Sequence, residues 1–371
     1  MEINNLEMIS FRNHNKTNIK FNSGLTIIWG ENGSGKTSIL EAIHSLSLGK
    51  SFRTNNKKEL IKEGKKSFLL KGIFKNNRGV KNKVLYFQDA LGNKRIKANE
   101  ETITKRKDLL GLNNVVVFSP EEETITKGPP KERRQFFNKV FSICSKKYLE
   151  LLLQYNRIIK QRNAILKNKK NKKEIEKELN PWNEPLSKTG QDLWNERVSL
   201  ANEFNGVFRL ITKEFDKNLK LKIIYNKKQK NKNSFLAKTK TNEQLDIKNG
   251  FTSFGPHKDE FLFLWKEKTI RKHGSQGEHK LFLALLKITE LVFLSQKTKK
   301  APIFLIDDLF ASLDKKRSKK LLRFVNKTQP KKGKKTQTII TTTEIADLEK
   351  NGFFLGFENI NKHRLKKQWN T

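Results

Sequence analysis

The residues best suited to chemistry form a glycine-rich segment near the N-terminus. This segment matches the pattern G-x-x-x-x-G-K-[ST], follows the apolar run 25–29 and precedes a helical pattern over 38–48. A strand, a glycine turn and a helix in this order bind phosphate through backbone N–H groups at the helix start. We expect an ATP site in which Lys36 reaches the β- and γ-phosphates and the Thr37 hydroxyl is a ligand of Mg²⁺. The predicted nucleotide-binding residues of this segment are Gly30, Glu31, Asn32, Gly33, Ser34, Gly35, Lys36 and Thr37.

Two acidic residues follow an apolar run nearer the C-terminus. Residues 303–306 are continuously apolar and lead directly into Asp307 and Asp308. A buried parallel strand presents the residues after its carboxyl end to the ligand site of an α/β sheet. We expect Asp307 to hold Mg²⁺, directly or through water. Asp308 is expected to orient or deprotonate the attacking water, so Asp308 and Lys36 are the predicted catalytic residues. Without the glycine-rich segment, solvated carboxylates would be the better interpretation.

A third motif decides the class of ATPase. Ser275, Gln276 and Gly277 precede a leucine-rich helical pattern and resemble the signature motif of ABC proteins. In that class the serine and nearby N–H groups meet a γ-phosphate held by another subunit, which again is anion binding at a helix start. Alone, the motif is more simply an N-capping serine in a glycine turn. The signature precedes the Asp307 strand, as the ABC order requires, and residues 311–314 and 341–343 match the D-loop and the switch threonines of that class.

Further segments occur in the order found in the RecF family, and together with the nucleotide motifs they span nearly the whole chain. The chain therefore resembles RecF proteins. The resemblance implies ATP-dependent homodimerisation and binding to single-stranded or gapped duplex DNA. It also implies weak DNA-dependent ATP hydrolysis, and work with RecR and RecO in loading RecA during repair, replication and the SOS response. The segments that carry the resemblance are residues 51–53, 118–121, 128–134, 161–163, 255–259 and 274–277.

Helical periodicity interrupts the strand-like and motif-rich sequence. Apolar residues recur every three or four positions over 131–167 and 186–215, which predicts a short antiparallel helical hairpin, with Pro181 in the first turn of its second arm. The predicted fold class is α/β, an ABC-type P-loop ATPase head with an inserted helical lobe. The expected parts are an N-terminal part of the head over 1–130, a helical lobe over 131–222 and a C-terminal part of the head over 223–371.

The composition favours a polyanionic partner. The chain has 371 residues and a formal net charge of +40, which attracts nucleic acid through phosphate neutralisation. The excess of lysine over arginine also fits an AT-rich genome, and the sequence does not choose between these explanations. No run approaches the ~18 apolar residues that span a bilayer. With no signal-peptide pattern and one cysteine, a cytoplasmic protein without internal disulfides is expected.

Several alternatives stay open. The chain could be a structural DNA-binding clamp with negligible hydrolysis, or another SMC-like ABC ATPase. Arg12, after a strand-like segment, could contact a nucleotide phosphate. Arg133 and Arg134 could pair with acidic residues or with DNA. His257 could act as a base, although a histidine beside Gly-Pro in a loop is more often structural.

Overall fold

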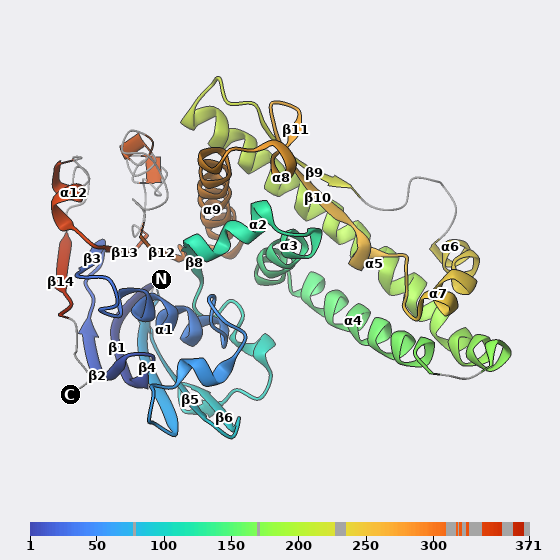
Figure 1. Cartoon of the computed structure of the whole chain (residues 1–371), viewed down its shortest axis with the longest axis horizontal. Coiled ribbons are helices and arrows are strands. Elements are labelled where there is room, and N and C mark those ends of the chain that lie inside the picture. Colours follow the sequence, from blue (N-terminus) through green and yellow to red (C-terminus); the bar gives the residue numbers. More distant parts are fainter. Residues whose placement is uncertain are drawn as a thin grey trace. The chain divides into compact units, whose positions relative to one another are not determined.

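The chain folds into two compact units. A computed structural model describes residues 1–76, 79–168, 171–226, 235–308, 317, 319–320, 324–325, 336–350 and 359–366 (Figure 1). The head unit comprises residues 1–123, 211–217 and 275–371, and the lobe unit comprises residues 124–210 and 218–274. Among the helices of the described residues, none has the length and apolar character needed to cross a membrane.

A parallel sheet carries the nucleotide motifs of the head unit. All its neighbouring strands are parallel, in the order β14-β3-β13-β12-β8. Strands β8, β12 and β13 are buried at every position. They are therefore apolar or threonine-rich throughout, as parallel sheets covered on both faces require. The strands are β14 (Ile360–Arg364), β3 (Leu25–Trp29), β13 (Thr338–Thr342), β12 (Ile303–Ile306) and β8 (Val115–Phe118).

An antiparallel sheet forms the second layer of the head unit, in the order β2-β1-β4-β5-β6-β7. Buried positions alternate with more exposed ones along β4 and β5, because one face of the sheet packs on the core and the other does not. The strands are β1 (Glu2–Phe11), β2 (His14–Lys20), β4 (Ser67–Lys75), β5 (Lys81–Asp89), β6 (Lys94–Ala98) and β7 (Glu101–Thr102).

Helix α1 (Lys36–Leu48) contacts strands of both sheets, and all its residues except Thr37 are buried. One hydrophobic cluster joins Ile39 and Ile43 of α1 to Leu70 of the antiparallel sheet and Leu305 of the parallel sheet. This packing fixes the position of the helix N-terminus. The other helical elements of the head unit are η1 (Lys57–Leu60), η2 (Arg106–Leu109), η3 (Pro120–Glu123), α9 (Gln276–Thr298) and α12 (Ile345–Lys350).

The lobe unit contains the predicted helical hairpin. Tyr148, early in α4, receives a hydrogen bond from Arg197 of α5, and Leu166, at the end of α4, packs with Ile175 near the start of α5. The two arms are therefore antiparallel, as predicted. The lobe elements are α2 (Thr124–Lys127), α3 (Pro130–Cys144), α4 (Lys146–Leu166), α5 (Lys172–Phe215, of which residues 211–215 belong to the head unit), α6 (Phe235–Thr241), α7 (Glu243–Asn249), η4 (Pro256–Lys258), α8 (Ile270–His273), β9 (Leu221–Asn226), β10 (Glu260–Trp265) and β11 (Lys268–Thr269).

The helix boundaries differ from the sequence-based ones in two places. The first arm is broken at Ser145, which adopts an extended conformation and accepts a hydrogen bond from the Tyr148 N–H to start α4. Pro181 lies inside α5 rather than in its first turn. The helix extends back to Lys172 because Leu179 is fully buried in a cluster with Leu166, and this packing outweighs the cost of the prolines.

The three-stranded sheet β11-β10-β9 groups with the helices of the lobe unit. Phe261 of β10 stacks on Phe137 of α3 with ring centroids 3.9 Å apart. Residues 218–274 therefore pack with the lobe by contact, whereas the predicted boundaries grouped 223–371 with the head. The apolar pattern of a strand does not reveal which unit the strand packs against. The predicted domain boundaries remain a hypothesis.

A buried carboxylate ties the lobe unit together. Asp259 is fully buried and accepts hydrogen bonds from Trp194 Nε1 at 2.7 Å, from the Tyr225 hydroxyl and from Arg197 at 3.1 Å. Arg197 is almost fully buried as well and also donates to the Pro256 carbonyl at 2.7 Å. A buried ion pair whose partners make several further hydrogen bonds specifies how the helices and β10 pack.

We expect Asp259→Asn to destabilise the lobe by about 3–5 kcal/mol, because the Arg197 charge is left buried without its partner. Urea unfolding followed by circular dichroism measures the loss. Glu267→Gln removes an exposed ion pair with Lys222 and is the control. The control is expected to stay within about 0.5 kcal/mol of the parent, and equal losses in both variants would contradict the assignment.

Candidate nucleotide site

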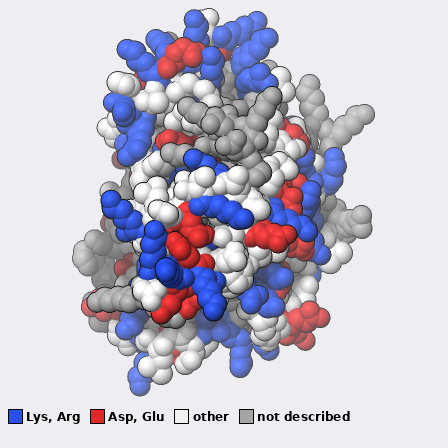
Figure 2. All heavy atoms as spheres, turned by 90° about the vertical axis from the view of Figure 1, so that its right-hand side faces the viewer, with Lys and Arg blue, Asp and Glu red and all other residues white. Residues whose placement is uncertain are grey.

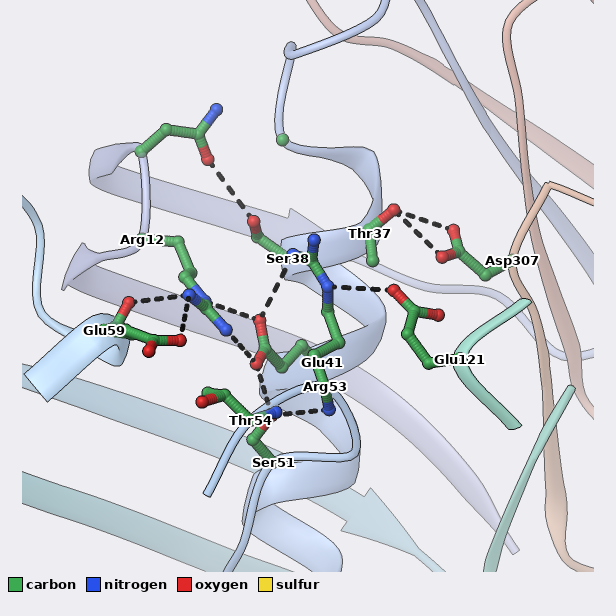
Figure 3. Close-up of polar contacts among 12 residues, drawn as sticks. Arg12, Thr37, Ser38, Glu41, Ser51, Arg53, Thr54, Glu59, Glu121 and Asp307 are labelled. Atoms are coloured by element: carbon green, nitrogen blue, oxygen red, sulfur yellow. Dashed lines mark hydrogen bonds and ion pairs between the residues drawn. The ribbon is translucent and has the colours of Figure 1, made fainter. Parts of the chain in front are cut away.

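Three elements bring the predicted phosphate- and metal-binding residues to the carboxyl edge of the parallel sheet. The loop after β3 leads into Lys36 and Thr37 at the start of α1, Asp307 follows β12, and Thr341 lies near the end of β13. The Thr37 hydroxyl lies 2.9 Å from Asp307 Oδ1 and 3.0 Å from Oδ2 (Figure 3). The Thr341 hydroxyl donates to Asp307 Oδ1 at 2.6 Å. The edge of the parallel sheet thus brings together Thr37 and Asp307, which are 270 residues apart in sequence.

Lys36 is held by its own loop. Its ammonium group donates to the Gly30 carbonyl at 2.7 Å and to the Glu31 carbonyl at 2.8 Å. Burial lowers the Lys36 pKa, and the nearby carboxylates of Asp308 and Asp307 act in the opposite direction. The group is therefore a preplaced cation at the centre of a turn suited to phosphate.

Side chains of the β1–β2 turn support the glycine-rich loop, which the sequence did not suggest. Asn13 Nδ2 donates to the Gly33 carbonyl at 3.0 Å. His14 Nε2 lies 3.1 Å from the Gly35 carbonyl, so Nε2 carries the proton and Nδ1 accepts from the Thr17 hydroxyl. Gly35 has φ 93°, and a Cβ there would contact the His14 ring and lie 2.7 Å from Asn13 Oδ1. Only glycine fits this position.

The environment of Asp307 suits a hard cation. Burial raises the Asp307 pKa, and the hydrogen bonds from Thr341 and Thr37 lower it. Hydroxyl and carboxylate oxygens are the ligands that Mg²⁺ prefers, and with phosphates present one carboxylate suffices. Within the described residues no group of three or more His, Cys, Asp or Glu side chains could hold a metal alone. The donor set of Thr37 and Asp307 therefore fits Mg²⁺ bound together with a nucleotide.

Asp308 has an unusual backbone conformation. Its φ is 44°, a left-handed value that costs energy for a residue other than glycine. Its N–H donates to the Thr341 hydroxyl at 3.1 Å. The turn lets Asp307 and Asp308, although consecutive, both line the same cavity.

That cavity has a volume of about 480 Å³, within the usual range for small-molecule sites. Its lining includes the predicted residues Asn32, Gly33, Gly35, Lys36, Thr37, Asp307 and Asp308, together with Thr341, Arg12, Asn13, Ser38, Arg53, Glu59, Ile61, Lys62 and Glu63.

A buried glutamate positions two arginines of this cavity (Figure 3). Glu41 of α1 is fully buried and accepts two hydrogen bonds from Arg12, at 2.8 and 2.7 Å, and one from the Ser51 hydroxyl. Arg53 lies 3.8 Å from Glu41 and 3.2 Å from Glu121, which follows β8. Sequence analysis identified Arg12 as a possible phosphate contact but missed Glu41. A single glutamate within a helical pattern gives no sign that it is buried.

The signature-like residues lie apart from this cavity. Ser275 accepts a hydrogen bond from the Glu278 N–H at 3.3 Å, and the Glu278 carboxylate accepts from the Ser275 N–H at 2.9 Å, which forms a capping box at the start of α9. Ser275 and Gln276 are exposed, and Gly277 is half-buried. They do not appear among the described residues that line the cavity. The D-loop candidate, 311–314, lies outside the described residues.

His257 is engaged at both ring nitrogens. Its Nε2 lies 2.9 Å from the Thr252 carbonyl and its Nδ1 lies 2.6 Å from the Tyr155 hydroxyl. Burial lowers the His257 pKa to about 4, so the ring is neutral at neutral pH. The arrangement favours the structural interpretation over a catalytic base.

The fold and the site together define a P-loop ATPase head of the ABC/SMC class. A protein-family model described as RecF/RecN/SMC N terminal domain matches residues 2–364. The chain is 34% identical over 355 residues to the DNA replication and repair protein RecF of Clostridium novyi (strain NT), covering 94% of each chain. It is 32% identical to the RecF of Prosthecochloris aestuarii, covering 93% of this chain and 94% of the relative. The chain belongs to the RecF family.

Solved structures agree with this assignment. A structure of the recombination mediator protein RecF with ATP in the RecFOR pathway matches with a TM-score of 0.83 and 28% identity, covering 97% of this chain and 95% of that chain. An Smc head domain from Pyrococcus furiosus matches with a TM-score of 0.58 and 18% identity, covering 98% and 94%. The second likeness concerns the fold alone.

We expect Glu41→Gln to lower the free energy of unfolding by about 1–3 kcal/mol, because Arg12 and Arg53 lose their buried carboxylate. Thermal unfolding measures the change. Glu59→Gln is the matched control, since Glu59 is half exposed and its carboxylate lies 3.9 Å from Arg12. A control variant as unstable as Glu41→Gln would show that Glu41 has no special role.

Proposed function

We propose that this chain is an ATP-binding and DNA-binding recombination mediator of the RecF type. It dimerises with ATP on single-stranded or gapped duplex DNA and, with RecR and RecO, supports RecA loading in repair, replication and SOS induction. The observation that carries the proposal is the convergence of Lys36, Thr37 and Asp307 at one sheet edge. The relatives add support, because they match nearly the whole chain and are named as repair proteins and recombination mediators.

The proposed chemistry follows from groups already in place. The loop N–H groups and Lys36 bind the phosphates, and Lys36 exchanges its two carbonyl partners for phosphate oxygens. Thr37 and Asp307 hold Mg²⁺, which offsets phosphate charge when it is bound. Asp308 orients the attacking water or accepts its proton, and Arg12, held by Glu41, is a further cationic side chain in the cavity lining.

The proposed dimer completes the site. Ser275, Gln276 and the N–H groups near Gly277 of a second protomer supply the remaining contacts to the γ-phosphate. Their exposure at the start of α9 supports this role, because a second copy can reach them. ATP then contributes to the interface itself, and nucleotide binding and dimerisation are thermodynamically linked.

The charge distribution suits backbone contacts with DNA. Figure 2 shows lysine and arginine side chains spread over the view, interspersed with acidic ones, rather than gathered in one patch. With a net charge of +40, the chain is expected to bind polyanions with a strong dependence on salt. The change in DNA affinity on adding nucleotide is therefore a better test of function than DNA binding itself.

We expect Lys36→Ala to lose MgATP binding and, with it, the ATP-dependent gain in DNA affinity, because the cation at the centre of the loop is gone. Fluorescence anisotropy on gapped and plain duplex at fixed salt, with and without MgATP, measures both. Lys65→Ala, which removes an exposed lysine that does not line the cavity, is the control. If MgATP raises the DNA affinity of Lys36→Ala as much as that of the parent, the proposed link between ATP binding and DNA binding is wrong.

We expect Asp308→Asn to slow ATP turnover by about 10²- to 10⁴-fold while ATP-dependent dimerisation is retained or strengthened. Phosphate release measures turnover, and analytical ultracentrifugation measures the dimer. A wild-type chain that dimerises with ATP but has no turnover to lose would be a passive clamp. A chain that stays monomeric with saturating MgATP and DNA contradicts the dimer model.

A further inference from the structure

The lobe unit contains a second cavity that ATP chemistry does not use. It has a volume of about 310 Å³ and lies among α3, α4, α5 and η4. None of the described residues that line it is acidic. Several come from segments that the nucleotide site leaves unexplained, namely 128–134 and 255–259. The lining residues that matter here are Lys131, Arg134, Gln135, Asn138, Asn156 and His257.

The floor of this lobe cavity is rigid. His257 is fixed by Tyr155 and Thr252, and Arg197 is fixed by Asp259 and the Pro256 carbonyl. Both side chains are held by protein hydrogen bonds, so they shape the cavity rather than act as its main ligands. A site whose walls are locked in this way loses little entropy on binding.

Other donors remain available at the cavity wall. Arg134 makes one described hydrogen bond, from NH1 to the Asp259 carbonyl at 2.9 Å, which leaves most of its five N–H groups for a ligand. Asn138 Oδ1 accepts from Tyr148 and Arg197, so its Nδ2 is the group left to donate. Among the described residues, the side chains of Lys131 and Gln135 make no hydrogen bond or ion pair.

The electrostatics of the cavity favour an anion. Burial lowers the Arg134 pKa, the neighbouring Arg197 charge acts in the same direction, and the carboxylates of Asp259 and Glu260 act in the opposite direction. Lys131 and Arg134 lie in the first turns of α3, where the helix dipole adds positive potential. A bound anion would reduce the repulsion between the Arg134 and Arg197 charges and would be attracted by Lys131.

We propose that the lobe cavity binds a phosphate group of a nucleic-acid strand, with Arg134 as the main ligand and Lys131 and Gln135 at its rim. A guanidinium group beside amide donors matches the several oxygens of phosphate. The cavity is large enough for part of the attached sugar, and Leu152 supplies an apolar wall. This inference rests on the proposed DNA binding and locates one of its contacts.

Two variants in α3 test the site, and each has a charge-matched control in α4. Arg134→Gln removes the main ligand, and Gln135→Glu places a carboxylate at the rim without breaking a described hydrogen bond. Arg157→Gln and Gln154→Glu make the same charge changes at exposed positions of α4 outside the cavity. Thermal unfolding of all four proteins checks the fold, and Gln135→Glu keeps the test valid if Arg134→Gln is unstable.

We expect Arg134→Gln to weaken binding to single-stranded DNA about tenfold in MgATP, and to make the slope of log K against log salt shallower by about 0.7. Gln135→Glu is expected to weaken binding in the same way, with both controls within about twofold of the parent. Equal DNA affinity in all five proteins would overturn the proposal.

Equilibrium dialysis with inorganic phosphate, on protein saturated with MgATP, separates the two sources of phosphate. If Arg134→Gln loses inorganic phosphate but binds DNA like the parent, the cavity serves free phosphate and the nucleic-acid assignment is wrong. If the wild-type chain binds no DNA at all, the proposed function fails together with this inference. If the wild-type chain binds DNA and both Arg134→Gln and Gln135→Glu bind it with the same affinity, this inference is wrong but the proposed function is not affected.

Discussion

The nucleotide site depends on the burial of α1 between two sheets. Every residue of this helix except Thr37 is buried, so the helix cannot shift without disturbing both layers of the head unit. Its N-terminus therefore presents the glycine-rich loop at a fixed place beside the ends of β12 and β13. The same burial places Glu41 inside the head, where its carboxylate can hold two arginines. Preorganised charges of this kind act on a developing negative charge without reorganising first.

The lobe unit also holds charged side chains in place by burial, here through an ion pair in its interior. Asp259 and Arg197 neutralise each other in the interior, and Trp194 and Tyr225 complete their hydrogen bonds. Such a pair is a weak source of net stability, because desolvation offsets most of the attraction. Its effect is to restrict the lobe to one packing, which also shapes the cavity beside Arg134.

Contiguous motifs were predictable from sequence because their chemistry and their local structure coincide. The glycine-rich loop needs only a strand before it and a helix after it, and Asp307 needs an apolar strand together with that loop. The ABC-type α/β head was predicted from these motifs and the antiparallel hairpin from helical periodicity, and the likeness to RecF structures confirms the fold class. The assignments of individual site residues remain predictions that the geometry supports.

Features that depend on contacts distant in sequence were not predictable. Ser145 breaks a helical pattern that is periodic on both sides, and α5 runs through two prolines because its first turns bury apolar residues. The roles of Glu41, Asn13 and His14 arise only when α1 and the β1–β2 turn meet. The membership of β9–β11 in the lobe likewise follows from the stacking of Phe261 on Phe137.

The capping box at the start of α9 has a consequence for anion binding by the signature segment. Its Ser275 N–H is already satisfied by a carboxylate of the same helix, that of Glu278. Glu278 is thus an internal competitor, and an arriving oxyanion must either displace it or use other donors. The Ser275 hydroxyl accepts from the Glu278 N–H through a lone pair, so its own proton stays free to donate. Helix capping and contact with a phosphate can therefore coexist on one oxygen atom.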